Sequence, residues 1–324
     1  PISIAIIIYL GWMAICIGPS SMPLVSLKFW LAKFWYVFVF YYLFSLIIKK
    51  QNNISAWFWA VIIPLSGIIV YVVVRHAEYQ FGRDIFIHVI QPFFDNHGIY
   101  SSMLAMFVPF LFVAAIRGDL FNYGAFRRSI FFFLAGLFVF AIIFSYTRAA
   151  WVSLMVALAG FVVLSLRINI QLIFGTIALA LVLGFSFQGQ LIMKLQENKQ
   201  GSSSKDIEDH LQSATNITND PSNLERLNRW SCAYRMFRDK PIFGFGPGTF
   251  TWQYAPYQLS YQMTIISTNF GTLGNAHSEY LGPLAEMGFL GFINWLGLVL
   301  TLAYFGVRNY YRAVDPKIKM LSLA

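Results

Sequence analysis

Long apolar runs dominate this sequence and constrain its fold more than any other feature. About eight of them are long enough to cross the roughly 30 Å of hydrocarbon in a bilayer. The runs are 2–18, 31–48, 56–74, 101–116, 129–146, 149–166, 170–187 and 287–307. They are continuous rather than alternating, whereas the strands of a membrane barrel alternate lipid-facing with lumen-facing residues. We therefore predict an all-α, polytopic transmembrane bundle with one large non-cytoplasmic loop that contains short helices.

The composition excludes an ordinary soluble domain. Hydrophobic residues make up 58% of the chain and charged residues only 11%, against roughly 25% charged residues in soluble proteins. A net charge of +9 would suggest nucleic acid as the partner of a soluble protein. Here most lysines and arginines lie between apolar runs, where they set membrane topology. We expect a membrane protein with no nucleic-acid partner.

Basic residues in the short connections predict the orientation of the spans. If the spans alternate, the connecting lysines and arginines fall on one side, which the positive-inside rule makes cytoplasmic. These residues are Lys49, Lys50, Arg117, Arg127, Arg128, Arg167, Arg308, Arg312, Lys317 and Lys319. The opposite side then receives the loop 75–100, the tight turn at Thr147 and Arg148, and the long polar stretch 188–279. We predict that these three segments face one another.

The same pattern predicts the domain organisation. Residues 1–187 form the first set of helices, about seven spans. Residues 188–279 form a loop domain, and residues 280–324 form a last span with a cytoplasmic segment. Since the chain begins with Pro1 and a new apolar stretch starts after Lys319, we interpret it as a fragment of a longer chain. The loop domain is the part that resembles folded aqueous protein, so function is sought there.

A helix is predicted inside the loop domain. Ser222 and Glu225 have the spacing of a capping box directly after Pro221, and Pro241 ends the helix. On a helical wheel one arc is apolar, and we expect it to be the packing face. This arc consists of Leu227, Trp230, Tyr234 and Phe237. Arg226 projects into the arc, and Arg229 lies on its margin.

Two arginines are candidates for binding an anion. A guanidinium on a packing face costs several kcal/mol unless it meets a negative charge, which makes Arg226 the sharper candidate. The alternative is a salt bridge to a nearby carboxylate such as Glu225 or Asp239. Arg148 stands between two spans with almost no loop, where it either extends to the headgroups or faces the bundle interior and binds phosphate.

His277 is the candidate general base, because an imidazole with a pKa near 6.5 can accept a proton from a hydroxyl at neutral pH. Glu279 and Glu286 follow it and either orient the ring or remain solvated. His97 is a weaker candidate of the same kind. Arg229 is a possible supporting residue of the site. The glycine-rich turn 241–248 lacks the strand and Lys-Ser or Lys-Thr of a nucleotide loop. With no metal-ligand cluster in the sequence either, we expect no metal and no cofactor.

Several motifs occur together in a specific order. They are Thr147-Arg148-Ala149-Ala150-Trp151, Arg226 four residues before Trp230, Pro241-x-x-Gly244-x-Gly246-x-Gly248-x-Phe250, and His277 with Gly288 eleven residues on. From about residue 146 to 291 the chain resembles the O-antigen ligase and polymerase family of bacterial inner membranes. Many ligases of this family have Leu where this chain has Trp230, so ligase and polymerase both stay open.

The resemblance implies a specific reaction. Members transfer a glycan from an undecaprenyl-diphosphate-linked donor to an acceptor hydroxyl at the periplasmic face, and the acceptor is a glycan, a lipid or a protein. It implies that Arg148 and Arg226 contact the donor diphosphate and that His277 activates the acceptor. Direct displacement would invert the sugar and require no metal.

Two other functions are compatible with a polytopic chain. A transporter or flippase for a polysaccharide precursor or small solute would carry charged residues within its spans, and these spans are nearly free of them. A non-catalytic scaffold for polysaccharide assembly would leave the position of Arg226 unexplained. The sequence leaves open the sugar, the acceptor, the chain length and the oligomeric state.

Overall fold

A computed structural model describes residues 1–51, 54–167, 221–268 and 274–323, and these residues form helices and no strands. The all-α prediction is therefore confirmed. The predicted span 170–187 and most of the polar segment before residue 221 lie outside the described residues. The chain divides into two compact units. The first joins Pro1–Gln51 with Ala178–Tyr304, and the second joins Asn52–Ile177 with Phe305–Ala324.

Within the described residues, six helical segments are long and apolar enough to cross a membrane. They are Pro23–Ile47, Ser55–Glu78, His97–Ile116, Ala125–Ile143, Arg148–Ser165 and Leu281–Arg312. Each corresponds to a predicted span, although the first begins eight residues earlier than expected. The predicted span 2–18 forms a shorter apolar helix, Ile2–Ile15. The chain is thus a multi-pass membrane protein.

The second unit is a bundle of antiparallel helices with a continuous apolar core. Its elements are α4 (Ile54–Glu78), α5 (Phe86–Val89), α6 (His97–Ile116), η2 (Gly118–Phe121), α7 (Ala125–Ile143), α8 (Arg148–Ser165) and α15 (Pro316–Leu323). Helix α6 packs against both α7 and α8, and α4 packs against α7. The core includes Leu104, Leu111 and Phe138, which are all buried. Inside a bilayer such side chains leave lipid rather than water, so van der Waals packing between the helices stabilises the bundle.

The two ends of the second unit carry different residues. At one end the Tyr146 hydroxyl donates to the Phe81 carbonyl (2.6 Å), and the Thr147 hydroxyl donates to the His97 carbonyl (3.4 Å). The loop 75–100 and the turn before Arg148 therefore share one end, as the alternation of spans predicts. At the other end α15 contacts η2 and α6. This end holds the basic residues of the connection 117–128 and of α15.

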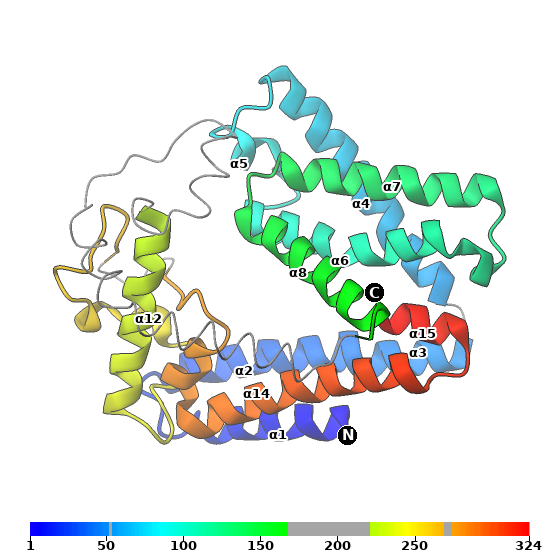
Figure 1. Cartoon of the computed structure of the whole chain (residues 1–324). Coiled ribbons are helices and arrows are strands. Elements are labelled where there is room, and N and C mark those ends of the chain that lie inside the picture. The colour runs from blue at the N-terminus through cyan, green and yellow to red at the C-terminus, as the bar shows by residue number, and fades with distance from the viewer. Residues whose placement is uncertain (52–53, 168–220, 269–273, 324) are drawn as a thin grey trace. The chain divides into compact units, whose positions relative to one another are not determined.

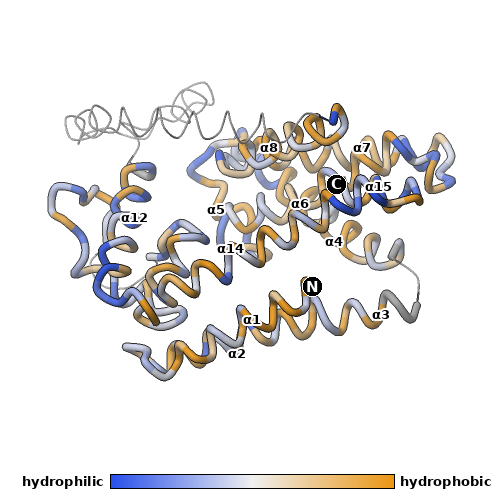
Figure 2. Tube along the Cα trace, turned by 60° about the horizontal axis from the view of Figure 1, so that its bottom comes forward, coloured by the Kyte–Doolittle hydropathy of each residue, from blue (hydrophilic) through white to orange (hydrophobic). Residues whose placement is uncertain are grey.

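The first unit is built around long apolar helices and a polar region. Its elements are α1 (Ile2–Ile15), α2 (Pro23–Val37), a π-helix (Phe38–Leu43), α3 (Phe44–Gln51), α12 (Pro221–Asp239), α13 (Phe250–Gln253), η3 (Ala255–Tyr257) and most of α14 (Leu281–Arg312). Helices α1, α2 and α14 run alongside one another (Figure 1). The Trp12 indole donates to the Met287 carbonyl, and the Trp30 indole donates to the Leu10 carbonyl, both at 3.0 Å. Hydrophilic residues gather along α12 (Figure 2).

The glycine-rich turn joins α12 to the start of α14. Gly288 interrupts α14 with a left-handed backbone (φ 69°), and a Cβ there would overlap the Ile242 carbonyl. Gly244 is also left-handed (φ 66°), and a Cβ there would overlap the backbone of Glu286. The Gly246 amide donates to the Glu286 carbonyl (2.8 Å), and the Phe289 amide donates to the Pro241 carbonyl (2.9 Å). The tight turn predicted from the glycines is therefore confirmed, and it fixes the chain that follows His277.

Candidate functional site

Helix α12 begins at Pro221 and ends at Asp239, so the helix predicted here is confirmed. Proline suits the first turn because it has no amide hydrogen to leave unpaired. The buried side chains recur every three or four residues, as expected for one helical face. They include Glu225, Asn228, Arg229, Cys232 and Met236. Half of this face is polar, which is unusual for the inner side of a helix.

The predicted packing face of α12 was wrong. Trp230 and Tyr234 are 39% and 55% exposed, and Arg226 is exposed beside them. The buried arginine is Arg229, which the helical wheel placed only on the margin. Glu225 pairs with Arg229 rather than with Arg226. The wheel failed because it assigns apolar residues to the interior, whereas here the interior holds charged groups whose partners come from a distant loop.

Arg229 and Glu225 form a buried ion pair, with Nε of Arg229 2.6 Å from Oε1 of Glu225 and both side chains about 5% exposed or less. The guanidinium also donates to the Thr268 hydroxyl (3.3 Å) and to the Asn275 carbonyl (3.4 Å). It lies 4.5 Å from the centre of the Tyr254 ring. Each part of this buried cation therefore has a partner, which is what makes its burial tolerable.

The second oxygen of Glu225 ties α12 to the segment 258–268. It accepts from the Thr264 hydroxyl at 3.0 Å and from the Ser267 hydroxyl, and Asn228 donates to Gln258 at 2.9 Å. Burial by itself would raise the pKa of the Glu225 carboxyl. The hydrogen bonds from Ser267, Arg229 and Thr264 and the charge of Arg229 outweigh burial and hold this pKa below its usual value. Glu225 is therefore ionised at neutral pH.

His277 is anchored through its backbone. It has a left-handed conformation (φ 47°), its amide donates to Asn275 Oδ1 (3.0 Å), and its carbonyl accepts from the Trp230 indole (3.4 Å). The residue is exposed, and its ring has no hydrogen bond to any of the described residues. The backbone of His277 is therefore held in place, and no described residue occupies either ring nitrogen.

The surroundings keep His277 neutral. Although His277 is exposed, neighbouring groups remove water from part of its surroundings, and this desolvation lowers the pKa of the imidazole below its ordinary value of 6.5. The positive charges of Arg229 and Arg226 lower the pKa further, whereas Glu225 acts in the opposite direction. A neutral imidazole can accept a proton at neutral pH. The structure therefore brings Arg226, Arg229 and His277 into one electrostatic neighbourhood.

Arg226 and Arg229 differ in what they can offer a ligand. The charge of Arg229 is compensated by Glu225, and its donors are occupied. Arg226 is exposed and has no hydrogen bond or ion pair to the described residues. A guanidinium in this state can bind a phosphate through two parallel hydrogen bonds.

Glu286 has a structural role that the sequence did not indicate. Its carboxylate accepts from the Gly248 amide and the Phe250 amide, both at 3.0 Å. The prediction that Glu286 orients the His277 imidazole is therefore wrong. These amides are also unavailable to a phosphate, which agrees with rejecting the turn as a nucleotide loop. Glu279 is exposed two residues after His277.

Arg148 and His97 belong to the second unit. Arg148 is the first residue of α8, half-buried and directly after the turn at Thr147. His97 begins α6, where the Asn96 side chain accepts from the Gly98 amide at 2.6 Å. The hydrogen bond from Thr147 to the His97 carbonyl brings the starts of α6 and α8 together.

The sequence reading missed most of the polar network around Arg229. Its members come from the segment after the glycine-rich turn: Tyr254, Gln258, Thr264, Ser267 and Thr268. No motif marks them, because each residue type is common in loops. One local signal was present, since Glu225 and Arg229 have the i, i+4 spacing of a helical ion pair.

Comparison with known proteins places this site within a known domain. A family described as O-antigen ligase matches residues 131–296, just over half of the chain, which include Arg148, Arg226, Arg229 and His277. A curated relative from Haemophilus influenzae, named only "Uncharacterized protein", is 30% identical over 84 residues. That match covers 26% of this chain and spans 20% of the relative's length. No solved structure matches. The chain belongs to the O-antigen ligase family.

Proposed function

We propose that the protein transfers an oligosaccharide or polysaccharide from an undecaprenyl-diphosphate donor to an acceptor hydroxyl at the periplasmic face of the bacterial inner membrane. Membership in the O-antigen ligase family supports glycan transfer. One observation carries the finer proposal: a neutral, exposed imidazole at His277 lies within the electrostatic reach of an exposed guanidinium at Arg226. A base beside an anion-binding cation is the pair that this reaction requires.

The reaction is a single displacement. The acceptor oxygen attacks the anomeric carbon of the donor sugar while the bond from that carbon to the diphosphate oxygen breaks. The electron pair leaves with undecaprenyl diphosphate, and the acceptor proton passes to a ring nitrogen of His277. Attack opposite the leaving group inverts the anomeric configuration. Positive charge at Arg226 stabilises the departing diphosphate, where negative charge develops.

Arg229 is a positioning residue in this proposal. It holds the Asn275 carbonyl, and the Asn275 side chain holds the His277 amide. Its charge also keeps the imidazole neutral. Arg148, a donor contact implied by the family resemblance, stays a prediction.

Replacing Arg226 with alanine should lower the transfer rate by roughly 10- to 100-fold, the range expected when one charged hydrogen-bonding group is removed. Purified protein is assayed with a labelled lipid-linked glycan and an acceptor. Arg238→Ala is the matched control, because Arg238 is an exposed arginine of the same helix. Equal rates for the two variants would contradict the role of Arg226.

The pH profile offers an independent check. Since the pKa of His277 lies below 6.5, transfer should persist as the pH falls through 6.5 and decline only when the imidazole becomes protonated. Removing the charge of Arg226 should raise this pKa and move the acidic limb of the profile to higher pH. The measurement is the initial transfer rate against pH for the wild type and Arg226→Ala. If the wild-type transfer rate already fell as the pH decreased toward 6.5 from above, His277 with a lowered pKa would be excluded as the base.

The cellular reaction is resolved by electrophoresis of surface glycans from cells that lack the gene. A ladder reduced to lipid core plus one repeat indicates a polymerase. Loss of all attached repeats, with glycan accumulating on the lipid carrier, indicates a ligase, and missing glycoprotein bands indicate a protein acceptor. Tracer uptake by purified protein in liposomes without glycan transfer would replace the proposal with transport.

A further inference from the structure

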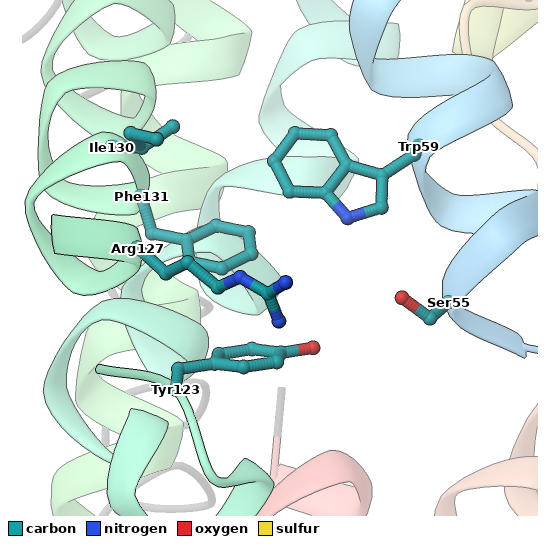
Figure 3. Close-up of a pocket in the computed structure, with 6 residues that line it drawn as sticks. All are labelled: Ser55, Trp59, Tyr123, Arg127, Ile130 and Phe131. Carbon is teal, nitrogen blue, oxygen red and sulfur yellow. The ribbon is translucent and has the colours of Figure 1, made fainter.

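A pocket lies at the basic end of the second unit, between the starts of α4 and α7. Its volume is about 410 Å³. The residues that line it are Ser55, Trp59, Tyr123, Arg127, Ile130 and Phe131. Figure 3 shows the guanidinium of Arg127 pointing into the space enclosed by Trp59, Ser55 and Tyr123. In this unit the starts of α6 and α8, with His97 and Arg148, lie at the opposite end, so the pocket is separate from them.

Two neighbouring arginines have different roles here. Arg128 donates to the Ala115 and Ile116 carbonyls, both at 3.0 Å, and so satisfies the end of α6. Arg127 makes no hydrogen bond or ion pair with the described residues. Its guanidinium carbon lies over the Tyr123 ring, 5.8 Å from the ring centre, in a cation–π contact. The nearby carboxylate of Asp119 is paired with Arg117 at 3.6 Å. Arg127 therefore brings to the pocket a positive charge that no carboxylate of the described residues compensates.

The other polar groups of the pocket are also available. The Ser55 and Tyr123 hydroxyls turn toward the same space as the guanidinium (Figure 3). Neither hydroxyl, nor the indole N–H of Trp59, has a hydrogen bond to another described residue. The lining offers several donors and one cation and contains no carboxylate. Such a set is complementary to an anion with several acceptor oxygens, such as a phosphate.

The apolar side of the pocket is held in a fixed arrangement. The Tyr123 ring stacks on the Phe131 ring with centroids 5.4 Å apart. The centroid of the Trp59 ring lies 5.2 Å from that of Phe131. Phe131 is buried, whereas Ile130 is exposed. A ligand in this pocket therefore meets a polar end and an apolar end. That division matches a molecule with both a phosphate and acyl chains.

We propose that this pocket binds the headgroup of an anionic phospholipid, with the phosphate on Arg127 and the hydroxyls of Tyr123 and Ser55. The location agrees with the chemistry, because the pocket lies at the ends of membrane spans, where headgroups are found and tryptophan is enriched. Basic pockets between spans on the cytoplasmic side are established sites for anionic lipids. A free phosphate would use the polar end alone and leave the apolar wall unexplained.

Native mass spectrometry of the purified protein tests this site. The protein is taken from mixed micelles that contain phosphatidylglycerol and phosphatidylcholine. We expect the wild type to retain one phosphatidylglycerol in preference to phosphatidylcholine. Arg127→Gln should weaken this retention by roughly tenfold, because it removes a charge-assisted contact with the phosphate. Arg127→Lys keeps the charge and should retain part of the preference.

The control is Arg167→Gln, which removes one exposed positive charge from the end of α8, on the side predicted to be cytoplasmic. It should bind phosphatidylglycerol as the wild type does. If Arg127→Gln and Arg167→Gln lost phosphatidylglycerol retention equally, the proposal would be overturned in favour of non-specific electrostatic attraction. Full displacement of the lipid by inorganic phosphate would also overturn it, since the apolar wall would then contribute nothing. Neither lipid-retention measurement depends on glycan transfer by His277.

Discussion

Replacing His277 with asparagine is expected to lower glycan transfer by roughly 10²–10⁴-fold, the usual contribution of a positioned general base. Asparagine is the informative substitution because position 277 has a left-handed backbone (φ 47°), a conformation that asparagine tolerates better than most residues. The amide cannot accept the acceptor's proton at neutral pH. The loss therefore reports on proton transfer rather than on strain. The measurement is the rate of transfer from a labelled lipid-linked glycan to acceptor by purified protein.

Two controls separate chemistry from folding in this experiment. His88→Asn changes an exposed histidine in α5 of the second unit and should leave transfer unchanged. Donor binding by His277→Asn should stay close to that of the wild type, because Arg226 is intact. A variant that is inserted, binds donor and transfers glycan at the wild-type rate would remove His277 from the mechanism.

Replacing Glu225 with alanine should destabilise the protein by about 3–5 kcal/mol, the cost of leaving one member of a buried ion pair without its partner. Arg229 is 4% exposed and has no other carboxylate among its contacts in the described residues. The Thr264 and Ser267 hydroxyls would lose their acceptor at the same time. We expect a large fall in the midpoint temperature of unfolding in detergent.

A double variant shows whether the loss comes from the unpaired charge. Glu225→Leu combined with Arg229→Met removes both charges and should be far less destabilising than the sum of the single changes. Glu78→Ala, at an exposed carboxylate of α4, is the control and should change the midpoint little. Additive effects of the two replacements would mean that Glu225 and Arg229 are not coupled.

The same ion pair gives stability a pH dependence. Because the pKa of Glu225 is lower in the folded protein than in the unfolded chain, its contribution is complete above the unfolded value. The contribution is lost as the pH falls through the folded value.

The sequence predicted several features of the site correctly. The helix at 221–239, the tight turn at 241–248 and the short connection before Arg148 all followed from proline, glycine and apolar spacing. These signals are local, because a proline or a left-handed glycine restricts the backbone whatever surrounds it. The six observed spans followed from continuous apolar length for the same reason.

The orientation of α12 could not be predicted in this way. A helical wheel compares residues only by their own hydropathy, and it placed Arg226 inward and Arg229 at the margin. Arg229 is buried because Thr268, Asn275 and Tyr254, which lie 25 to 46 residues along the chain, supply its partners. The free energy of burying a charge depends on such partners.

The sequence by itself determined an all-helical membrane chain of the O-antigen ligase family, with a histidine and two arginines as candidates for its chemistry. Only the tertiary structure decided which arginine of α12 is exposed to a ligand and which is paired inside the protein. It alone also revealed the pocket around Arg127, whose walls come from two helices about seventy residues apart. Membrane insertion depends on the hydropathy of each segment, whereas a buried charge or a pocket depends on groups that only folding brings together.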